Sequence, residues 1–177
     1  MSKTARQHKE SAPKSLGFAV IICSTSRHQN FRTGKPVVDE SGDLIVKTLQ
    51  THGHSIVFRE LIPDDRTLIE KSVEKALRSM QVDALIICGG TGISPTDVTI
   101  ETVEPILEKR LPGFGEIFRW LSYKDIGSAA VMTRAIAGVS AGKAVFCVPG
   151  SPQAVRLCLE RLILLEAGHI ILHARGK

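Results

Sequence analysis

The chain has 177 residues, of which 43% are hydrophobic and 23% charged, values that fit one globular domain and exclude a collagen-like chain, a coiled-coil rod and a wholly disordered chain. The net charge is +5, but four cations and one acid lie in residues 1–16, so the rest of the chain carries only +2. This balanced remainder lacks a dense basic stripe with stacking aromatic residues, and we expect no nucleic-acid partner.

The N-terminus is basic and polar. It lacks the apolar core of about 7–15 residues that defines a secretory signal, and no apolar run reaches the roughly 18 residues of a membrane span. We therefore expect a cytoplasmic protein with no membrane partner. A flexible basic tail is predicted over residues 1–15, followed by a single α/β domain over residues 16–177.

From Gly17 onward, short apolar runs alternate with polar or amphipathic stretches. Continuous apolar runs of this length are typical of strands buried on both faces, and they predict strands over 17–23, 54–62 and 83–90. The stretch over 24–40 is polar and is interpreted as a loop. Helical spacing of apolar residues predicts helices over 41–53 and 65–80, with Asp65 as N-cap of the second.

The second half continues this alternation. Helices are predicted over 98–111, with a kink at Pro105, and over 113–127 and 152–168. The segment 134–140 and a strand over 143–150 are separated by two residues, which predicts an antiparallel hairpin. The expected fold is a three-layer α/β sandwich with a mostly parallel sheet and one antiparallel pair.

The four cysteines are widely spaced, and none has the paired spacing of a zinc site. Three of them close apolar runs, so we interpret all four as buried thiols: Cys23, Cys88, Cys147 and Cys158.

Glycines follow the third predicted strand directly. Gly89, Gly90 and Gly92 flank Thr91, and glycines allow backbone amides to turn toward an anion while the hydroxyl adds a side-chain contact. We interpret this loop as a phosphate cradle. The alternative is a glycine turn that only reverses the chain. The spacing matches neither a Walker A loop nor a dinucleotide fingerprint.

Carboxylates occur at two loop-to-helix junctions that should share the ligand-binding edge of the sheet. Asp97 follows the glycine loop, and Asp64 and Asp65 follow the second predicted strand. Any one of them could be a helix N-cap. Two such loops beside a phosphate cradle nevertheless favour Mg²⁺, which binds through one or two carboxylates together with substrate phosphates.

Two further polar segments follow predicted strands. Gly150 and Ser151 form a tight turn with a hydroxyl, for which the alternative role is Ser151 as a helix N-cap. The stretch over 24–35 offers candidates for anion contacts or a mobile flap, namely Ser24, Ser26, Arg27, Arg32 and Lys35. Spacing alone does not select among them.

Four segments together resemble the MoaB/MogA family, the molybdopterin adenylyltransferases of molybdenum cofactor biosynthesis. They are LIPDD (61–65), ICGGTGISPTDVT (87–99), PGFGEIFRWLSYKDIG (112–127) and FCVPGSPQAV (146–155), and the resemblance extends over about 16–173. The GGTG string followed by D-V-T is the most specific feature, and FRWLSYKDIG favours the MoaB branch.

The resemblance implies a molybdopterin-binding-like fold and an enzyme that uses Mg²⁺ and ATP to adenylylate molybdopterin, with release of pyrophosphate. It places the catalytic, metal-binding carboxylates at Asp64 and Asp97 and the phosphate cradle at Gly89, Gly90, Thr91 and Gly92. It places pterin or phosphate contacts at Ser24, Gly150 and Ser151. It also implies a homo-oligomer, either a trimer or a hexamer.

One position departs from the family pattern. Many members carry a basic residue directly before D-V-T, whereas this chain has Thr96. Arg27, Arg32 or Lys35 could supply that cation. Two alternatives to catalysis stay open: a non-catalytic molybdopterin carrier or scaffold, and a subunit that assembles with other molybdenum cofactor biosynthesis proteins. The intact D-V-T string favours catalysis.

Aromatic residues cluster in one predicted helix. Half of the chain's eight aromatics lie there, at Phe114, Phe118, Trp120 and Tyr123, beside the aliphatic Ile117 and Leu121. Such a helix could face the core, or it could form a subunit contact, because aromatics are enriched in interface cores.

Overall fold

The computed structural model describes residues 11–176 and contains a six-stranded sheet. The strands are β1 (Gly17–Cys23), β2 (Ser55–Ile62), β3 (Ala84–Cys88), β4 (Lys109–Arg110), β5 (Ile136–Ser140) and β6 (Lys143–Val148). Their order is β2-β1-β3-β6-β5-β4. The first four strands of that order pair in parallel, while β5 is antiparallel to both of its neighbours. The mostly parallel sheet and the hairpin are therefore confirmed.

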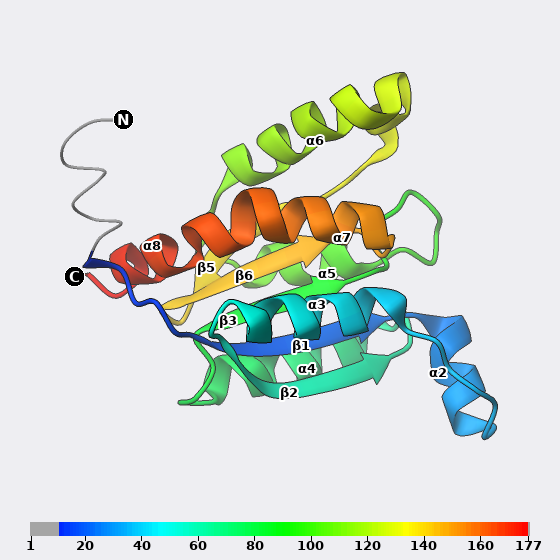
Figure 1. Ribbon diagram of the computed structural model, residues 1–177. Helices are drawn as coiled ribbons and strands as arrows, with labels where there is room; N and C mark the ends of the chain where they lie inside the picture. The colour runs from blue at the N-terminus through cyan, green and yellow to red at the C-terminus, as the bar shows by residue number, and fades with distance from the viewer. Residues whose placement is uncertain (1–10, 177) are drawn as a thin grey trace.

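Helices cover both faces of this sheet (Figure 1). They are α2 (Thr25–Arg32), α3 (Glu40–Thr51), α4 (Arg66–Arg78), α5 (Thr99–Val103), α6 (Pro112–Ile126), α7 (Pro152–Cys158) and α8 (Leu164–Ala174). A π-helical turn over 159–163 joins α7 to α8. Helices α3, α6, α7 and α8 pack on one face and α4 and α5 on the other, which is the expected three-layer sandwich. In residues 11–176, none of the helices combines the length and the hydrophobicity that crossing a bilayer requires.

Two apolar clusters hold the layers together. Alternate side chains of β1 point to opposite faces, so Phe18 and Ile22 join one cluster and Ile21 joins the other. Both clusters contain fully buried aliphatic side chains, each of which stabilises the fold by about 1.5–3 kcal/mol. This rigid sheet fixes the positions of the loops that leave its carboxyl edge.

The polar stretch over 24–40 is not the loop that its composition predicts. Residues Thr25–Arg32 form helix α2, capped by the Ser24 hydroxyl, which accepts a hydrogen bond from the Arg27 amide at 3.5 Å. Helix α2 has no buried residue, so the helix leaves no hydrophobic periodicity in the sequence. It extends beyond the end of β1 (Figure 1).

The predicted helix over 98–111 is also wrong in its second half. Helix α5 ends at Val103, a short 3-10 turn contains Pro105, and the chain then enters strand β4. Proline lacks the amide that an α-helix needs and its ring clashes with the preceding turn. It therefore ends the helix instead of kinking it. The last predicted helix, over 152–168, runs on to Ala174.

The predicted tail and the cysteines are placed as follows. Residues 1–10 of the tail lie outside the described part of the chain, whereas the Ser15 hydroxyl donates to the Gly53 carbonyl at 2.8 Å. All four cysteines are free thiols and buried, as predicted. Burial raises the pKa of the Cys23 thiol to about 12, so this side chain is neutral at physiological pH.

Candidate active site

The carboxyl edge of the parallel strands carries a pocket of about 620 Å³. The start of α2 after β1 and the loops that follow β2, β3 and β6 line it, together with residues 132–134 before β5. Parallel strands end at the same edge, which is where open α/β sheets bind ligands. The structure brings together at this pocket eight of the nine residues to which the resemblance gives a role, Ser151 being the exception: Ser24, Asp64, Gly89, Gly90, Thr91, Gly92, Asp97 and Gly150.

The glycine loop has the conformation for which glycine is required. Gly89 and Gly90 have φ angles of +101° and +60°, which side chains disfavour. Thr99 fixes both residues, since its hydroxyl donates to the Gly89 carbonyl at 2.9 Å and its amide donates to the Gly90 carbonyl at 3.0 Å. A β-carbon added to Gly90 would lie 2.7 Å from Asp64 Oδ1. The loop and that carboxylate are therefore closely packed.

The two carboxylates of the pocket are held in the same manner. The amide and hydroxyl of Thr25 donate to Asp64 Oδ2 at 2.9 and 2.8 Å, and the Ser94 amide donates to Asp97 Oδ2 at 2.9 Å. In both aspartates, the Oδ1 atom makes no hydrogen bond to any residue between 11 and 176. Each carboxylate is thus anchored through its Oδ2 atom, and its Oδ1 atom remains available to a ligand.

This donor set fits Mg²⁺. Mg²⁺ accepts one or two protein carboxylates and completes its coordination with water and substrate phosphates. No group of three or more His, Cys, Asp or Glu side chains that could hold a metal occurs in the described chain. A metal at Asp64 and Asp97 would therefore depend on ligands from the substrate.

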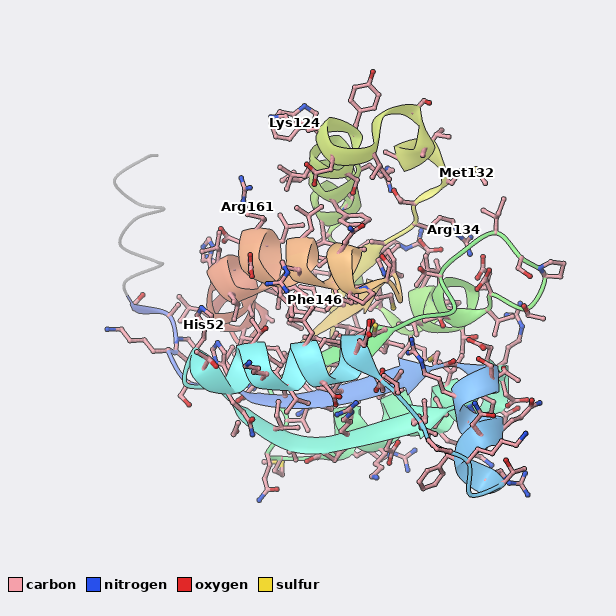
Figure 2. The ribbon with its side chains drawn as sticks, turned by 45° about the vertical axis from the view of Figure 1, so that its right-hand side comes forward. His52, Lys124, Met132, Arg134, Phe146 and Arg161 are labelled. Atoms are coloured by element: carbon pink, nitrogen blue, oxygen red, sulfur yellow. The ribbon has the colours of Figure 1, made fainter. Side chains whose placement is uncertain are left out.

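Arg134 is a residue of the pocket that the sequence did not indicate. It precedes β5 and lies beside the glycine loop (Figure 2). Its Nε donates to the Thr91 carbonyl at 2.8 Å and its Nη2 to the Gly92 carbonyl at 2.6 Å. Its Nη1 pairs with Glu101 Oε1 at 2.6 Å, and this hydrogen bond lowers the pKa of the Glu101 carboxyl. Arg134 thus clamps the loop. A single arginine 43 residues away carries no spacing signal that could have revealed it.

The structure also separates the cations of the 24–35 stretch. Arg27 lines the pocket, whereas Arg32 and Lys35 do not. Thr96 is in the pocket wall, where its hydroxyl lies 3.0 Å from that of Ser94. Of the three cations named as substitutes for a basic residue at 96, the structure therefore leaves Arg27.

Ser151 lies outside this pocket. Its hydroxyl accepts from the Ala154 amide at 3.3 Å and so caps α7, and it lines a second groove of about 580 Å³ between α6 and α7. Its predicted contact to pterin or phosphate would therefore have to be made from that neighbouring groove.

Helix α6 divides its aromatic residues between core and surface. Phe118 is fully buried and Phe114 packs against Phe146 with ring centroids 5.5 Å apart. Trp120 and Tyr123 are 57% and 63% exposed. The core-facing interpretation therefore holds for one face of this helix, and the exposed aromatic residues of the other face leave the subunit contact as a prediction.

Comparison with known proteins gives consistent matches over almost the whole chain. Residues 19–169 match the family model described as "Probable molybdopterin binding domain". A Bacillus subtilis protein named "Molybdenum cofactor biosynthesis protein B" is 42% identical over 173 residues, covering 97% of this chain and 98% of the relative. A Methanocaldococcus jannaschii protein named "Probable molybdopterin adenylyltransferase" is 40% identical, covering 92% and 96%. A crystal structure of a "Molybdenum cofactor biosynthesis protein B" superposes with a TM-score of 0.85 at 39% identity, covering 94% and 100%.

Proposed function

The chain belongs to the family of molybdopterin-binding domains, and we propose that it acts in molybdenum cofactor biosynthesis as an adenylyltransferase. Its substrates would be molybdopterin and ATP, as the names of its relatives suggest. In the proposed reaction, an oxygen of the terminal phosphate of molybdopterin bonds to the α-phosphorus of ATP. The bond from that phosphorus to the bridging oxygen breaks, and pyrophosphate leaves.

The single observation that carries this proposal is that one pocket contains a glycine loop and two carboxylates, each with one oxygen available to a ligand. Asp64 and Asp97 each keep one oxygen without a hydrogen bond to the described residues, beside a loop whose backbone is fixed by Thr99. This arrangement suits two phosphorylated substrates, because a phosphate nucleophile is ionised near neutral pH and needs no general base. The protein must instead align two polyanions and offset their repulsion.

Mg²⁺, if bound at Asp64 and Asp97, would neutralise charge on the phosphates. The chain's own residues have separate tasks. Gly89 and Gly90 allow backbone amides to approach a phosphate closely, and Arg134 occupies the Thr91 and Gly92 carbonyls with hydrogen bonds.

The direct test is pyrophosphate release from purified protein given molybdopterin, Mg²⁺ and ATP, with the product identified by mass. Asp97→Asn keeps an acceptor for the Ser94 amide but removes the charge, and we expect it to lower kcat by at least about a hundredfold, the usual scale for loss of a preorganised electrostatic group. Asp65→Asn is the matched control, because Asp65 caps α4 through the Leu68 amide and does not line the pocket. It should release pyrophosphate at the wild-type rate.

The outcomes separate the competing functions. Adenylylated pterin that disappears in Asp97→Asn supports the proposal and the role of Asp97. Undiminished turnover in that variant refutes the assignment of the carboxylate. Tight molybdopterin binding without any ATP-dependent product selects the carrier or scaffold. Capture of pathway proteins without small-molecule dependence selects the assembly subunit.

We also propose that the outer face of α6 contacts further copies of this chain. Ile117, Trp120 and Tyr123 are exposed on one helix, and aromatic surfaces of this kind are enriched at subunit contacts. Closed cyclic symmetry would give a trimer or, by pairing of two rings, a hexamer. Sedimentation of the wild type against Trp120→Glu tests this, and a monomeric wild type would refute it.

A further inference from the structure

Two guanidinium groups line the pocket, and they differ in what their N–H groups do. Arg134 directs its Nε and both terminal nitrogens at loop carbonyls and at Glu101. Arg27 makes one side-chain contact within residues 11–176, from Nη1 to Asp39 Oδ1 at 3.1 Å. Since a guanidinium carries five N–H donors, Arg27 is the pocket arginine with donors left for a ligand.

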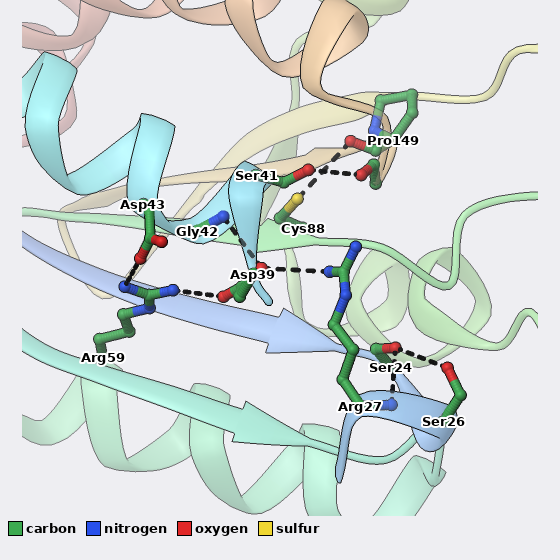
Figure 3. A network of polar contacts seen from close by, with 11 residues as sticks. Ser24, Ser26, Arg27, Asp39, Ser41, Gly42, Asp43, Arg59, Cys88 and Pro149 are labelled. Carbon is green, nitrogen blue, oxygen red and sulfur yellow. Dashed lines mark hydrogen bonds and ion pairs between the residues drawn. The ribbon is translucent and has the colours of Figure 1, made fainter. Parts of the chain in front are cut away.

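Arg27 is held from outside the pocket. It lies in the first turn of α2, and among residues 11–176 its side chain pairs with Asp39, which precedes α3 (Figure 3). Asp39 does not line the pocket, and its side chain is 9% exposed. The contact therefore fixes one edge of the guanidinium, and Arg27 itself lines the pocket.

Asp39 is itself fixed on three sides. Its Oδ1 accepts a hydrogen bond from the Gly42 amide at 3.1 Å, and this bond caps α3. Its Oδ2 pairs with Arg59 on β2. Arg59 in turn pairs with Asp43 at 2.7 Å. A chain of alternating charges thus runs from β2, through the start of α3, to the wall of the pocket (Figure 3).

The same turn of α3 holds the opposite wall. The buried Ser41 hydroxyl donates to the Gly150 carbonyl at 2.7 Å. Gly150 follows β6 and lines the pocket. Residues 39–42 therefore set the position of the first and last loops of the site relative to each other.

From this geometry we propose that Arg27 binds a phosphate group of a substrate and that Asp39 is the positioning residue that orients it. The proposal rests on the proposed function only in that the ligands are phosphorylated. A free arginine side chain loses rotamer entropy when a ligand orders it. Its pair with the buried Asp39 imposes that order before the ligand arrives, and affinity rises accordingly.

The competing explanation is that Asp39 only caps α3 and stabilises the fold. A thermodynamic cycle distinguishes the two, because a residue that acts through Arg27 has no effect on binding once Arg27 is absent. The variants are Arg27→Met, Asp39→Asn and the double variant. Asparagine is as good an N-cap as aspartate, so Asp39→Asn removes the charge and keeps the start of α3.

The measurement is the calorimetric Kd of the purified protein for ATP and for molybdopterin, each titrated separately. For at least one of them we expect Arg27→Met to weaken binding by about tenfold to a hundredfold, the value of a hydrogen bond to a charged group. Asp39→Asn should weaken the same ligand by about threefold to thirtyfold, the range that side-chain ordering allows. In the Arg27→Met background, Asp39→Asn should change Kd less than twofold.

Two further variants guard against a folding artefact. Asp43→Asn removes the other carboxylate bound to Arg59 but does not touch Arg27, so the Kd should equal that of the wild type. Gly42→Ala keeps every charge, yet its methyl group would occupy the space of the Asp39 carboxylate. It should reproduce the loss seen in Asp39→Asn, and it replaces that variant if Asp39→Asn does not fold.

Each outcome bears on one proposal. The positioning role would be overturned if Asp39→Asn weakened binding equally with and without Arg27. It would also be overturned if Arg27→Met bound both ligands as tightly as the wild type. A wild type that binds both ligands but forms no adenylylated product would refute the proposed reaction while the cycle still decides the role of Asp39. A reaction that proceeds normally with additive losses would refute the positioning role alone.

Discussion

The clamp that Arg134 places on the glycine loop leads to a quantitative prediction. Arg134→Met removes two hydrogen bonds from a charged donor to the Thr91 and Gly92 carbonyls, together with an ion pair to Glu101. Hydrogen bonds to charged groups contribute about 1.5–3 kcal/mol each. The side chain is 32% exposed, so about 1 kcal/mol for each carbonyl and less than 1 kcal/mol for the ion pair is the appropriate scale.

The expected loss is therefore about 2–3 kcal/mol of unfolding free energy, which for a domain of this size lowers Tm by roughly 5–10 °C. Urea denaturation and calorimetry measure it. Arg78→Met is the matched control, because Arg78 pairs with Glu74 on the exposed surface of α4 and its loss should cost only about 0.5 kcal/mol or less. If Arg134→Met were no less stable than Arg78→Met, the structural clamp would be refuted. We further expect product formation to fall in Arg134→Met, since the released loop carbonyls could turn toward the phosphates.

Three further predictions concern the pocket. Gly90→Ala should lose activity and more stability than Gly34→Ala, since both have positive φ but only Gly90 has close neighbours on its open side; equal losses in urea denaturation would show that crowding is irrelevant. The pKa of Glu101 is lowered by its hydrogen bond from Arg134, so its stabilisation is present above the ordinary pKa and lost as pH falls through the folded value. The Tm difference between wild type and Glu101→Gln should thus be constant near pH 7 and shrink in acid, and a difference that grows in acid would contradict this. The pKa of Cys23 is raised to about 12 by burial, so a thiol reagent should label it at pH 8 only after unfolding, and rapid labelling of the native protein would disprove its burial.

Local patterns were sufficient to predict most of the fold. The continuous apolar run over 17–23 matches β1 residue for residue, because a strand buried on both faces needs such a run. Asp65 caps α4 as expected, since a cap depends on residues three positions apart. The glycines after β3 were recognisable because the positive φ of Gly89 and Gly90 is a requirement that few other residues meet.

Elements that depend on distant contacts could not be predicted in this way. Helix α2 buries nothing and so leaves no periodic trace. The two-residue strand β4 exists because Lys109 and Arg110 pair with β5 about 30 residues later in the chain. In neither case does the neighbouring sequence contain the partner that determines the structure.

The sequence by itself determined the alternation of strands and helices, the glycine loop and the carboxylates at its edge, because each depends on the chemistry of a few adjacent residues. Only the tertiary structure decided which cations lie at the site. Arg134 reaches the loop from 42 and 43 residues away, and Arg27 lines the pocket whereas Arg32 and Lys35 do not. Contacts of this kind form only when the strands assemble into the sheet, because the assembled sheet brings together side chains that are far apart in the sequence.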